Sequence, residues 1–256
     1  MRAGRPGRTV TEVRREGDLP LWEHPEWRDR FPWLVQGVTG VGGVDQPFDL
    51  ALFGDGRTSE VMARWRALGR ATGATRIAHG HQVHRAAVCF HSEKTPGLYV
   101  SPETDGHVSG TPGVLLTVSV ADCVPISLVA PEHRAVALLH GGWRGVAAGI
   151  LERGIFVLEE RLGACPADLN VHLGPAICGD CYEVGQEVYR ALGLPEPPQP
   201  ERLDLRAHVA ERALRTGVTE DGITVSEHCT LCGSSRFFSH RGGRSERQVA
   251  VLGISS

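Results

Sequence analysis

The sequence has no large excess of charge of either sign. Lys and Arg total 27 and Asp and Glu total 30, which gives a formal net charge of -3 over 256 residues. A chain that binds nucleic acid through its overall charge is strongly basic, so we expect no nucleic-acid partner. The length allows one or two domains and is enough to bury a core without disulfides or metal.

A long hydrophobic run without a charge is also missing. The longest apolar stretch, Gly113 to Ala130, contains Asp122 near its middle and Pro125 shortly after it. A carboxylate at that depth in a bilayer is costly, so two buried strands that meet at a polar corner are favoured over a membrane span. No apolar segment follows the basic residues Met1 to Arg8, so we expect neither a secretory signal nor a membrane partner.

The cysteine count is odd. Seven cysteines in a chain of this length do not resemble the even set of a small disulfide-stapled secreted domain. We expect free thiols or metal ligands and a cytoplasmic location.

Apolar periodicity predicts a mixed α/β (α+β) fold without internal repeats. We expect residues 1–15 to be a flexible N-terminal tail and residues 16–256 to form a single domain. The expected helices cover residues 58–73, 146–163, 184–192 and 204–215. The expected strands cover residues 76–88, 114–120, 125–129, 134–140, 223–225 and 249–254.

The segment from Ala121 to Gly145 holds most of the chemistry-bearing residues. Asp122 and Cys123 lie between two apolar runs, and His140 ends a predicted strand before a glycine-rich turn into a helix. Such a turn presents backbone N–H groups that favour an anion, and Arg144 adds positive charge, so Gly141, Gly142 and Arg144 are candidate phosphate-binding residues. The alternative is that the glycines only form a tight turn.

Three histidines lie within six residues, at His79, His81 and His84. Imidazole suits zinc and copper, and one of these histidines with Cys123 and His140 would form a three-ligand centre with an open fourth position. Such a zinc ion acidifies its water and polarises a substrate oxygen. We expect Asp122 to act as general base or to orient a ligand.

The chain resembles the laccase-domain family, which is named for multicopper polyphenol oxidase and is also described as purine nucleoside phosphorylase and as peptidoglycan editing factor. The resemblance runs in the family's order from about residue 35 to the C-terminus. It rests on Gln82-Val83-His84, Ala121-Asp122-Cys123, His140-Gly141-Gly142-Trp143-Arg144-Gly145, Gly174-Pro175-Ala176-Ile177, Cys181-Tyr182-Glu183-Val184-Gly185, Cys229-Thr230-Leu231-Cys232 and Arg236-Phe237-Phe238-Ser239.

The resemblance implies a layered sandwich with a mixed sheet, similar to the catalytic domain of cytotoxic necrotizing factor. It implies a zinc ion held by His84, Cys123 and His140, and it places Gln82 beside the site. Two arginines of the family fall on altered positions: one on Arg64 or Arg66 in the early helix, and one on Arg247, which follows Glu246 where the family has glycine.

The activity implied by the resemblance is phosphorolysis of adenosine, inosine and S-methyl-5'-thioadenosine, together with deamination of adenosine. The expected partners are a nucleoside and phosphate, and the chain is a monomer or a homodimer. One alternative is a copper-dependent polyphenol oxidase, although the only methionines that could supply an axial ligand are Met1 and Met62. Another is a Cys–His hydrolase or amidase that edits peptidoglycan precursors, with Cys123 as nucleophile.

Two further features have alternative interpretations. The pairs Cys178/Cys181 and Cys229/Cys232 could hold a structural zinc, but they are further apart than the pairs of a zinc ribbon, so small buried thiols are the favoured explanation. Asp105 precedes Gly106, and this dipeptide is typical of a turn rather than of a catalytic carboxylate.

Overall fold

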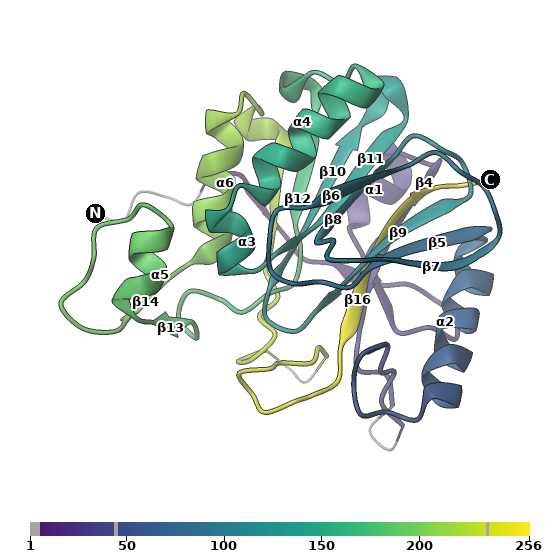
Figure 1. The fold of residues 1–256 in the computed structure, drawn as a ribbon, viewed down its shortest axis with the longest axis horizontal. Helices are drawn as coiled ribbons and strands as arrows, with labels where there is room; N and C mark the ends of the chain where they lie inside the picture. The colour runs from purple at the N-terminus through teal and green to yellow at the C-terminus, as the bar shows by residue number, and fades with distance from the viewer. Residues whose placement is uncertain (1–5, 44–45, 234–235) are drawn as a thin grey trace.

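The computed structural model describes residues 6–43, 46–233 and 236–256. Two sheets of seven strands lie face to face in this part of the chain (Figure 1). The first sheet has the order β1 (Arg8–Val10), β15 (Ile223–Ser226), β12 (Asn170–Leu173), β10 (Val124–Ala130), β11 (Ala135–Gly141), β8 (Gly106–Ser109), β6 (Val88–His91). The second has the order β2 (Val13–Arg14), β3 (Leu21–Glu23), β4 (Leu34–Thr39), β16 (Gln248–Ile254), β9 (Val114–Val120), β5 (Arg76–Gly80), β7 (Gly97–Ser101).

Helices cover the outer faces of both sheets. The helices are α1 (Pro25–Arg30), α2 (Thr58–Thr72), α3 (Trp143–Ala147), α4 (Ile150–Leu162), α5 (Gln186–Ala191) and α6 (Leu205–Arg215). Figure 1 shows α4 and α6 on one side of the sandwich and α2 on the other. A short hairpin of β13 (Glu183–Val184) and β14 (Glu201–Arg202) precedes α6. No helix among the described residues is long and apolar enough to cross a membrane.

Alternation along the central strands assigns their side chains to separate layers, because successive residues of a strand point to opposite faces. On β11, Val136 and Leu138 pack between the sheets, whereas Ala137 and Leu139 pack in the cluster that contains α4. On β9, Leu115 instead joins the cluster of α2. Removing a buried leucine from such a core costs about 2–5 kcal/mol of unfolding free energy.

Strand directions are mixed, which confirms the predicted mixed α/β fold. β10 pairs antiparallel with β11 and β12, whereas β12 pairs parallel with β15 and β5 pairs parallel with β9. The connection between β9 and β10 crosses from the second sheet to the first, and the predicted polar corner at Asp122 lies in it.

The expectation of a flexible tail over residues 1–15 is wrong from Arg8 onward. β1 pairs with β15 in one sheet and β2 pairs with β3 in the other. Between them Glu12 is buried and accepts hydrogen bonds from His172 Nε2 at 2.9 Å and Ser226 Oγ at 2.8 Å. These partners are more than 150 residues away, so no local pattern could indicate them. Residues 1–5 lie outside the described part.

Other element predictions need smaller corrections. The helix expected over residues 146–163 is two helices, because Gly149 at φ +87° interrupts it. The helix expected from Val184 begins at Gln186, and Val184 itself pairs with Glu201 in the hairpin. The strand expected over residues 76–88 ends at Gly80, and the chain then forms the loop that carries His84.

Candidate metal centre and cavity

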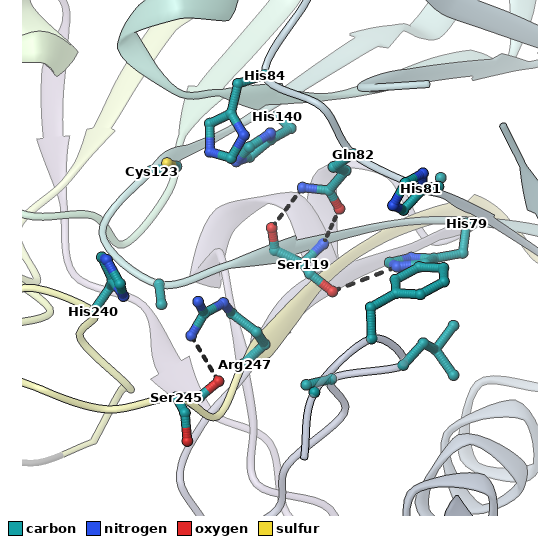
Figure 2. A pocket seen from close by; sticks show the side chains of 16 residues that line it. His79, His81, Gln82, His84, Ser119, Cys123, His140, His240, Ser245 and Arg247 are labelled. Carbon is teal, nitrogen blue, oxygen red and sulfur yellow. Dashed lines mark hydrogen bonds between the residues drawn. The ribbon is translucent and has the colours of Figure 1, made fainter. Parts of the chain in front are cut away.

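Three predicted ligands from distant parts of the chain come together at one end of a cavity (Figure 2). His84 lies in the loop after β5, Cys123 in the connection between β9 and β10, and His140 near the end of β11. One ligand atom from each lies within 4.8 Å of the others. The rings of His84 and His140 are nearly perpendicular, with centroids 4.7 Å apart.

Asp105 organises two of these three ligands. Its carboxylate is fully buried and accepts a hydrogen bond from His140 Nδ1 at 2.9 Å. Since Nδ1 donates to Asp105, His140 presents Nε2 to the centre, which is the arrangement that fixes a metal-ligating histidine.

The same carboxylate holds the loop of His84. The backbone N–H groups of Val83, His84 and Arg85 donate to it at 3.1, 2.9 and 3.0 Å. Three successive N–H groups that converge on one carboxylate form an anion-binding nest. They hold His84 in the left-handed region at φ +58°, which is uncommon for a residue other than glycine.

The charges of the cluster favour the form of cysteine that binds metal. Burial raises the pKa of the Cys123 thiol, but the charge and hydrogen bond of His140 and the hydrogen bond of His84 outweigh it, so the pKa is lowered overall. Burial disfavours the charged form of His140, yet Cys123 and Asp105 together raise its pKa. A thiolate beside a carboxylate-anchored imidazole is a suitable donor set for zinc.

Gly142 and Gly141 are required for close packing. A Cβ at Gly142 would lie 2.8 Å from His84 Cδ2 and 3.3 Å from Cys123 Sγ, and a Cβ at Gly141 would lie 2.7 Å from the carbonyl oxygen of Val124. The glycines therefore let the β11–α3 turn pass directly behind the ligands.

The predicted phosphate-binding residues of this turn do not line the cavity. Helix α3 has only five residues, and the Arg144 guanidinium lies over the Trp143 ring, 4.2 Å from its centroid. Gly141, Gly142 and Arg144 are absent from the cavity wall among the described residues, whereas Gln82 lies on it. The Gln82 amide is held by the backbone of Ser119 on β9, accepting at 2.7 Å and donating at 2.8 Å.

The hydrogen bonds of the Asp122 carboxylate go to residues other than the three ligands. Asp122 adopts φ +83°, and its two carboxylate oxygens accept hydrogen bonds from Thr230 Oγ1 and from the Arg241 backbone N–H. Both oxygens are thus used to fix the connection that carries Cys123. The orienting carboxylate is Asp105, which the sequence presented only as a turn residue because its hydrogen-bond partners come from the loop after β5 and from β11.

The cavity has a volume of about 330 Å³, within the range of about 300–1,000 Å³ typical of small-molecule sites. It is lined by Ala51, Leu52, Phe53, Gly54, His79, Gly80, His81, Gln82, His84, Ser119, Ala121, Cys123, His140, His240, Ser245 and Arg247. Figure 2 shows Arg247, Ser245 and His240 on the side away from Gln82.

Two parts of this wall carry features that a ligand could use. Phe53 is 64% exposed, and its ring lies 4.8 Å from that of His81 at 61°. Arg247 brings a positive charge, and its Nη1 donates to the carbonyl oxygens of Ser245 and Glu246 at 2.8 and 2.9 Å. These contacts fix the guanidinium at the wall.

Two of the remaining candidates, His79 and Arg64, contact residues outside the group of three ligands. His79 Nδ1 lies 2.9 Å from Thr117 Oγ1, and its ring packs against Trp65. Arg64 lies 3.5 Å from Glu60 on the same helix and does not line the cavity, so Arg247 is the arginine that the structure places there.

The fold and this site define a mixed α/β protein with a three-ligand Cys-His-His centre that opens into a small-molecule cavity. The family model described as multi-copper polyphenol oxidoreductase laccase matches residues 39–255. The chain belongs to this family, which confirms the resemblance found in the sequence.

Several relatives carry enzyme names. "Purine nucleoside phosphorylase YlmD" from Geobacillus stearothermophilus is 40% identical over 165 residues, which cover 59% of this chain and 60% of the relative. "Purine nucleoside phosphorylase" from Deinococcus radiodurans is 37% identical over 195 residues, 73% of each chain. "Adenosine deaminase RL5", from an unknown prokaryotic organism, is 33% identical over 179 residues, 62% of this chain and 67% of the relative. The match thus spans about three fifths of the Geobacillus relative.

A solved structure extends the likeness to almost the whole chain. The crystal structure of YlmD from Geobacillus stearothermophilus superposes with a TM-score of 0.87 at 30% identity and covers 96% of this chain and 100% of that one. Strands β1 and β2, which the sequence presented as a tail, precede the part matched by the family model.

Proposed function

We propose that the chain is a zinc-dependent enzyme of purine nucleosides, which cleaves adenosine, inosine and S-methyl-5'-thioadenosine with phosphate and deaminates adenosine. The observation that carries the proposal is the group of three donor atoms within 4.8 Å of one another at the end of the cavity. The relatives named purine nucleoside phosphorylase and adenosine deaminase support the class of purine nucleosides.

The residues present fit a zinc ion. Two imidazoles and a thiolate match the borderline-soft character of zinc, and three protein ligands leave a position open toward the cavity. His84, Cys123 and His140 would hold the ion, and Asp105 would fix His140. When bound, zinc would supply a Lewis acid that stabilises negative charge as it develops on the substrate.

The cavity wall provides separate places for the base and for an anion. The exposed ring of Phe53, beside His81, offers an apolar face on which a purine can stack. Arg247 would bind phosphate through charge-assisted hydrogen bonds. Arg144 stays a prediction that the cavity does not support.

These positions orient the reactants for phosphorolysis. A phosphate oxygen forms a bond to ribose C1', the glycosidic bond breaks, and the purine leaves with the bonding electrons and takes up a proton. In deamination, a water oxygen forms a bond to C6 of adenine, the bond from C6 to the amino nitrogen breaks, and that nitrogen takes up a proton from the water and leaves as ammonia. Holding phosphate at Arg247 and the base at Phe53 would favour the first reaction through proximity.

The test is a product analysis with adenosine. Zinc-loaded protein is incubated with adenosine, with and without inorganic phosphate, and the products are separated by chromatography. We expect adenine and ribose 1-phosphate only with phosphate, and inosine in both arms. Cys123→Ala is expected to form none of these three products. Absence of all three products from protein that carries zinc at this centre would overturn the proposal.

A second candidate function is a Cys–His hydrolase. The contacts that favour it are the hydrogen bond of Asp105 to His140 and the interaction of His140 with Cys123, an arrangement of nucleophile, base and orienting carboxylate. This enzyme would keep its activity after chelation, whereas the zinc enzyme would lose it.

The copper oxidase alternative has less support. A blue-copper site with two histidines and a cysteine adds a weak axial methionine. Met62 lies on α2 and does not line the cavity, and Met1 is outside the described residues. Within the described residues, the group formed by His84, Cys123 and His140 is the one potential metal site that contains histidine.

A further inference from the structure

A second group of metal-binding side chains lies outside the cavity. We call it the four-cysteine cluster; its members are Cys178, Cys181, Cys229 and Cys232. The four Sγ atoms all lie within 4.8 Å of one another, and no disulfide joins them. The nucleoside site uses none of these residues.

The spacing within the cluster matches metal coordination. Cys178 Sγ and Cys232 Sγ are 3.7 Å apart. A disulfide has an S–S length of about 2.05 Å, so this pair is not bonded. With zinc–sulfur bonds of about 2.3 Å, the edge of a regular sulfur tetrahedron is about 3.8 Å. The separation in the structure matches that expected for two ligands of one tetrahedral ion.

The backbone is arranged to stabilise thiolate. Cys229 Sγ accepts three backbone N–H groups, from Cys178 at 3.3 Å, Leu231 at 3.4 Å and Cys232 at 3.4 Å. Such donors favour the charged sulfur, which is the form that binds metal. At Gly233, a Cβ would lie 2.5 Å from the Cys229 carbonyl oxygen, so glycine allows this tight turn.

Sheet topology explains how pairs so far apart in sequence meet. β12 and β15 are parallel neighbours, so their carboxyl ends lie at the same edge of the first sheet. Cys178 and Cys181 follow β12, whereas Cys229 and Cys232 follow β15. An isolated parallel bridge between Ala176 and Cys229 continues the pairing up to the cluster. The long gap in the sequence is thus occupied by α5, the hairpin and α6.

We propose that the four-cysteine cluster binds a structural zinc ion, independent of the zinc ion at the nucleoside site. Four thiolates close the coordination sphere, which is typical of structural and not of catalytic zinc. The ion would join the two segments that follow β12 and β15.

Both joined segments contact the connection that carries Cys123. The Ile177 N–H donates to the Asp122 carbonyl oxygen at 3.1 Å, and Thr230 Oγ1 donates to the Asp122 carboxylate. Each of these donors is adjacent in sequence to a cysteine of the cluster. We therefore assign the ion a positioning role: it holds the partners of Asp122 in place.

The test counts metal ions per chain. Protein is kept reduced, loaded with excess zinc, desalted and measured by native mass spectrometry and elemental analysis. We expect two zinc ions in the wild type and one in Cys232→Ser. Cys165→Ser, which changes an exposed cysteine outside both groups, is the matched control and is expected to keep two.

Cys123→Ala separates this proposal from the proposed function. It leaves the four-cysteine cluster intact, so it is expected to keep one zinc. After cobalt substitution that ion should give the intense charge-transfer absorption of all-thiolate coordination. If Cys232→Ser does not fold, the cobalt absorption of Cys123→Ala still shows whether the four-cysteine cluster binds a metal ion.

Three results would overturn the proposal. They are a wild type that binds at most one zinc ion, a Cys123→Ala protein without all-thiolate cobalt absorption, and iron as the ion in the cluster of the isolated protein. If the wild type binds two zinc ions but forms no product from adenosine, the four-cysteine site stands and the proposed function fails.

Discussion

Replacing Asp105 by asparagine tests how the centre is built. The substitution keeps the volume of a fully buried side chain and removes its charge. The lost charge weakens the 2.9 Å hydrogen bond from His140, and the new amide group must face at least one backbone N–H of the 83–85 loop. Removing a carboxylate that orients a ligating histidine lowers metal affinity by about 10–100-fold, which corresponds to about 1.4–2.7 kcal/mol.

The assay is a zinc titration against a competing chromophoric chelator. Asp122→Asn is the matched control, because it changes a carboxylate next to Cys123 whose hydrogen bonds go to Thr230 and Arg241 and not to a ligand. We expect a 10–100-fold loss for Asp105→Asn and a smaller change for the control. Wild-type zinc affinity in Asp105→Asn, or a larger loss in Asp122→Asn, would refute this account of the centre.

Three further predictions concern the base, the anion and stability. Phe53→Ala should raise the KM for adenosine in steady-state assays with little change in kcat, because it removes a stacking contact of about 1–3 kcal/mol; an unchanged KM would contradict base stacking here. Arg247→Gln should raise the KM for phosphate by about 10–100-fold, from the loss of a charged hydrogen bond of about 1.5–3 kcal/mol, whereas Arg144→Gln should change it little. A larger increase in the KM for phosphate in Arg144→Gln than in Arg247→Gln would indicate that phosphate binds at the glycine-rich turn instead. In urea titrations, the free energy of unfolding should fall as the pH is lowered from 6.5 toward 4, because burial lowers the pKa of five histidines in the folded state: His24 to about 3, His79, His91 and His208 to about 4, and His107 well below its usual range.

The sign of this pH effect follows from proton binding. Below pH 6.5 the unfolded chain protonates these histidines while the folded chain keeps them neutral, so lowering the pH favours unfolding. Between pH 6.5 and its folded-state pKa, each histidine lowers the free energy of unfolding by up to about 1.4 kcal/mol per pH unit of acidification. The pKa of His140 is instead raised to about 9, so its stabilising contribution is fully present below pH 6.5 and adds no slope inside this window. A free energy of unfolding that is flat or rises on acidification would contradict the prediction.

The sequence predicted the elements whose signal is local. Periodicity gave the α2 helix to within a residue at its C-terminal end and the β9 strand without change. Strands β1 and β2 were missed because they consist of three and two residues, and because the partners of β1 and of the buried Glu12 are more than 150 residues away. Strands β4, β8 and β12 were also not predicted, and each consists of six residues or fewer.

At the site, too, the residues with a local motif were predicted and those that depend on distant partners were not. Family motifs placed His84, Cys123 and His140 together, and the structure brings them to one point. The orienting role of Asp105 could not be predicted, because it depends on a loop and a strand that meet only in the fold. An aspartate–glycine dipeptide is typical of an exposed turn, so the sequence pattern does not indicate that Asp105 is buried. The four-cysteine cluster was undervalued for a similar reason: sequence spacing ignores the parallel pairing of β12 and β15.

The central claim is that adenosine cleavage depends on a metal ion held by His84, Cys123 and His140. The most direct measurement is the rate of adenine release, in the presence of phosphate, before chelation, after chelation and after return of zinc. The account predicts that activity disappears with the metal and returns with zinc in the wild type, and never returns in Cys123→Ala. Metal-free protein that releases adenine at the rate of the zinc-loaded enzyme would contradict it.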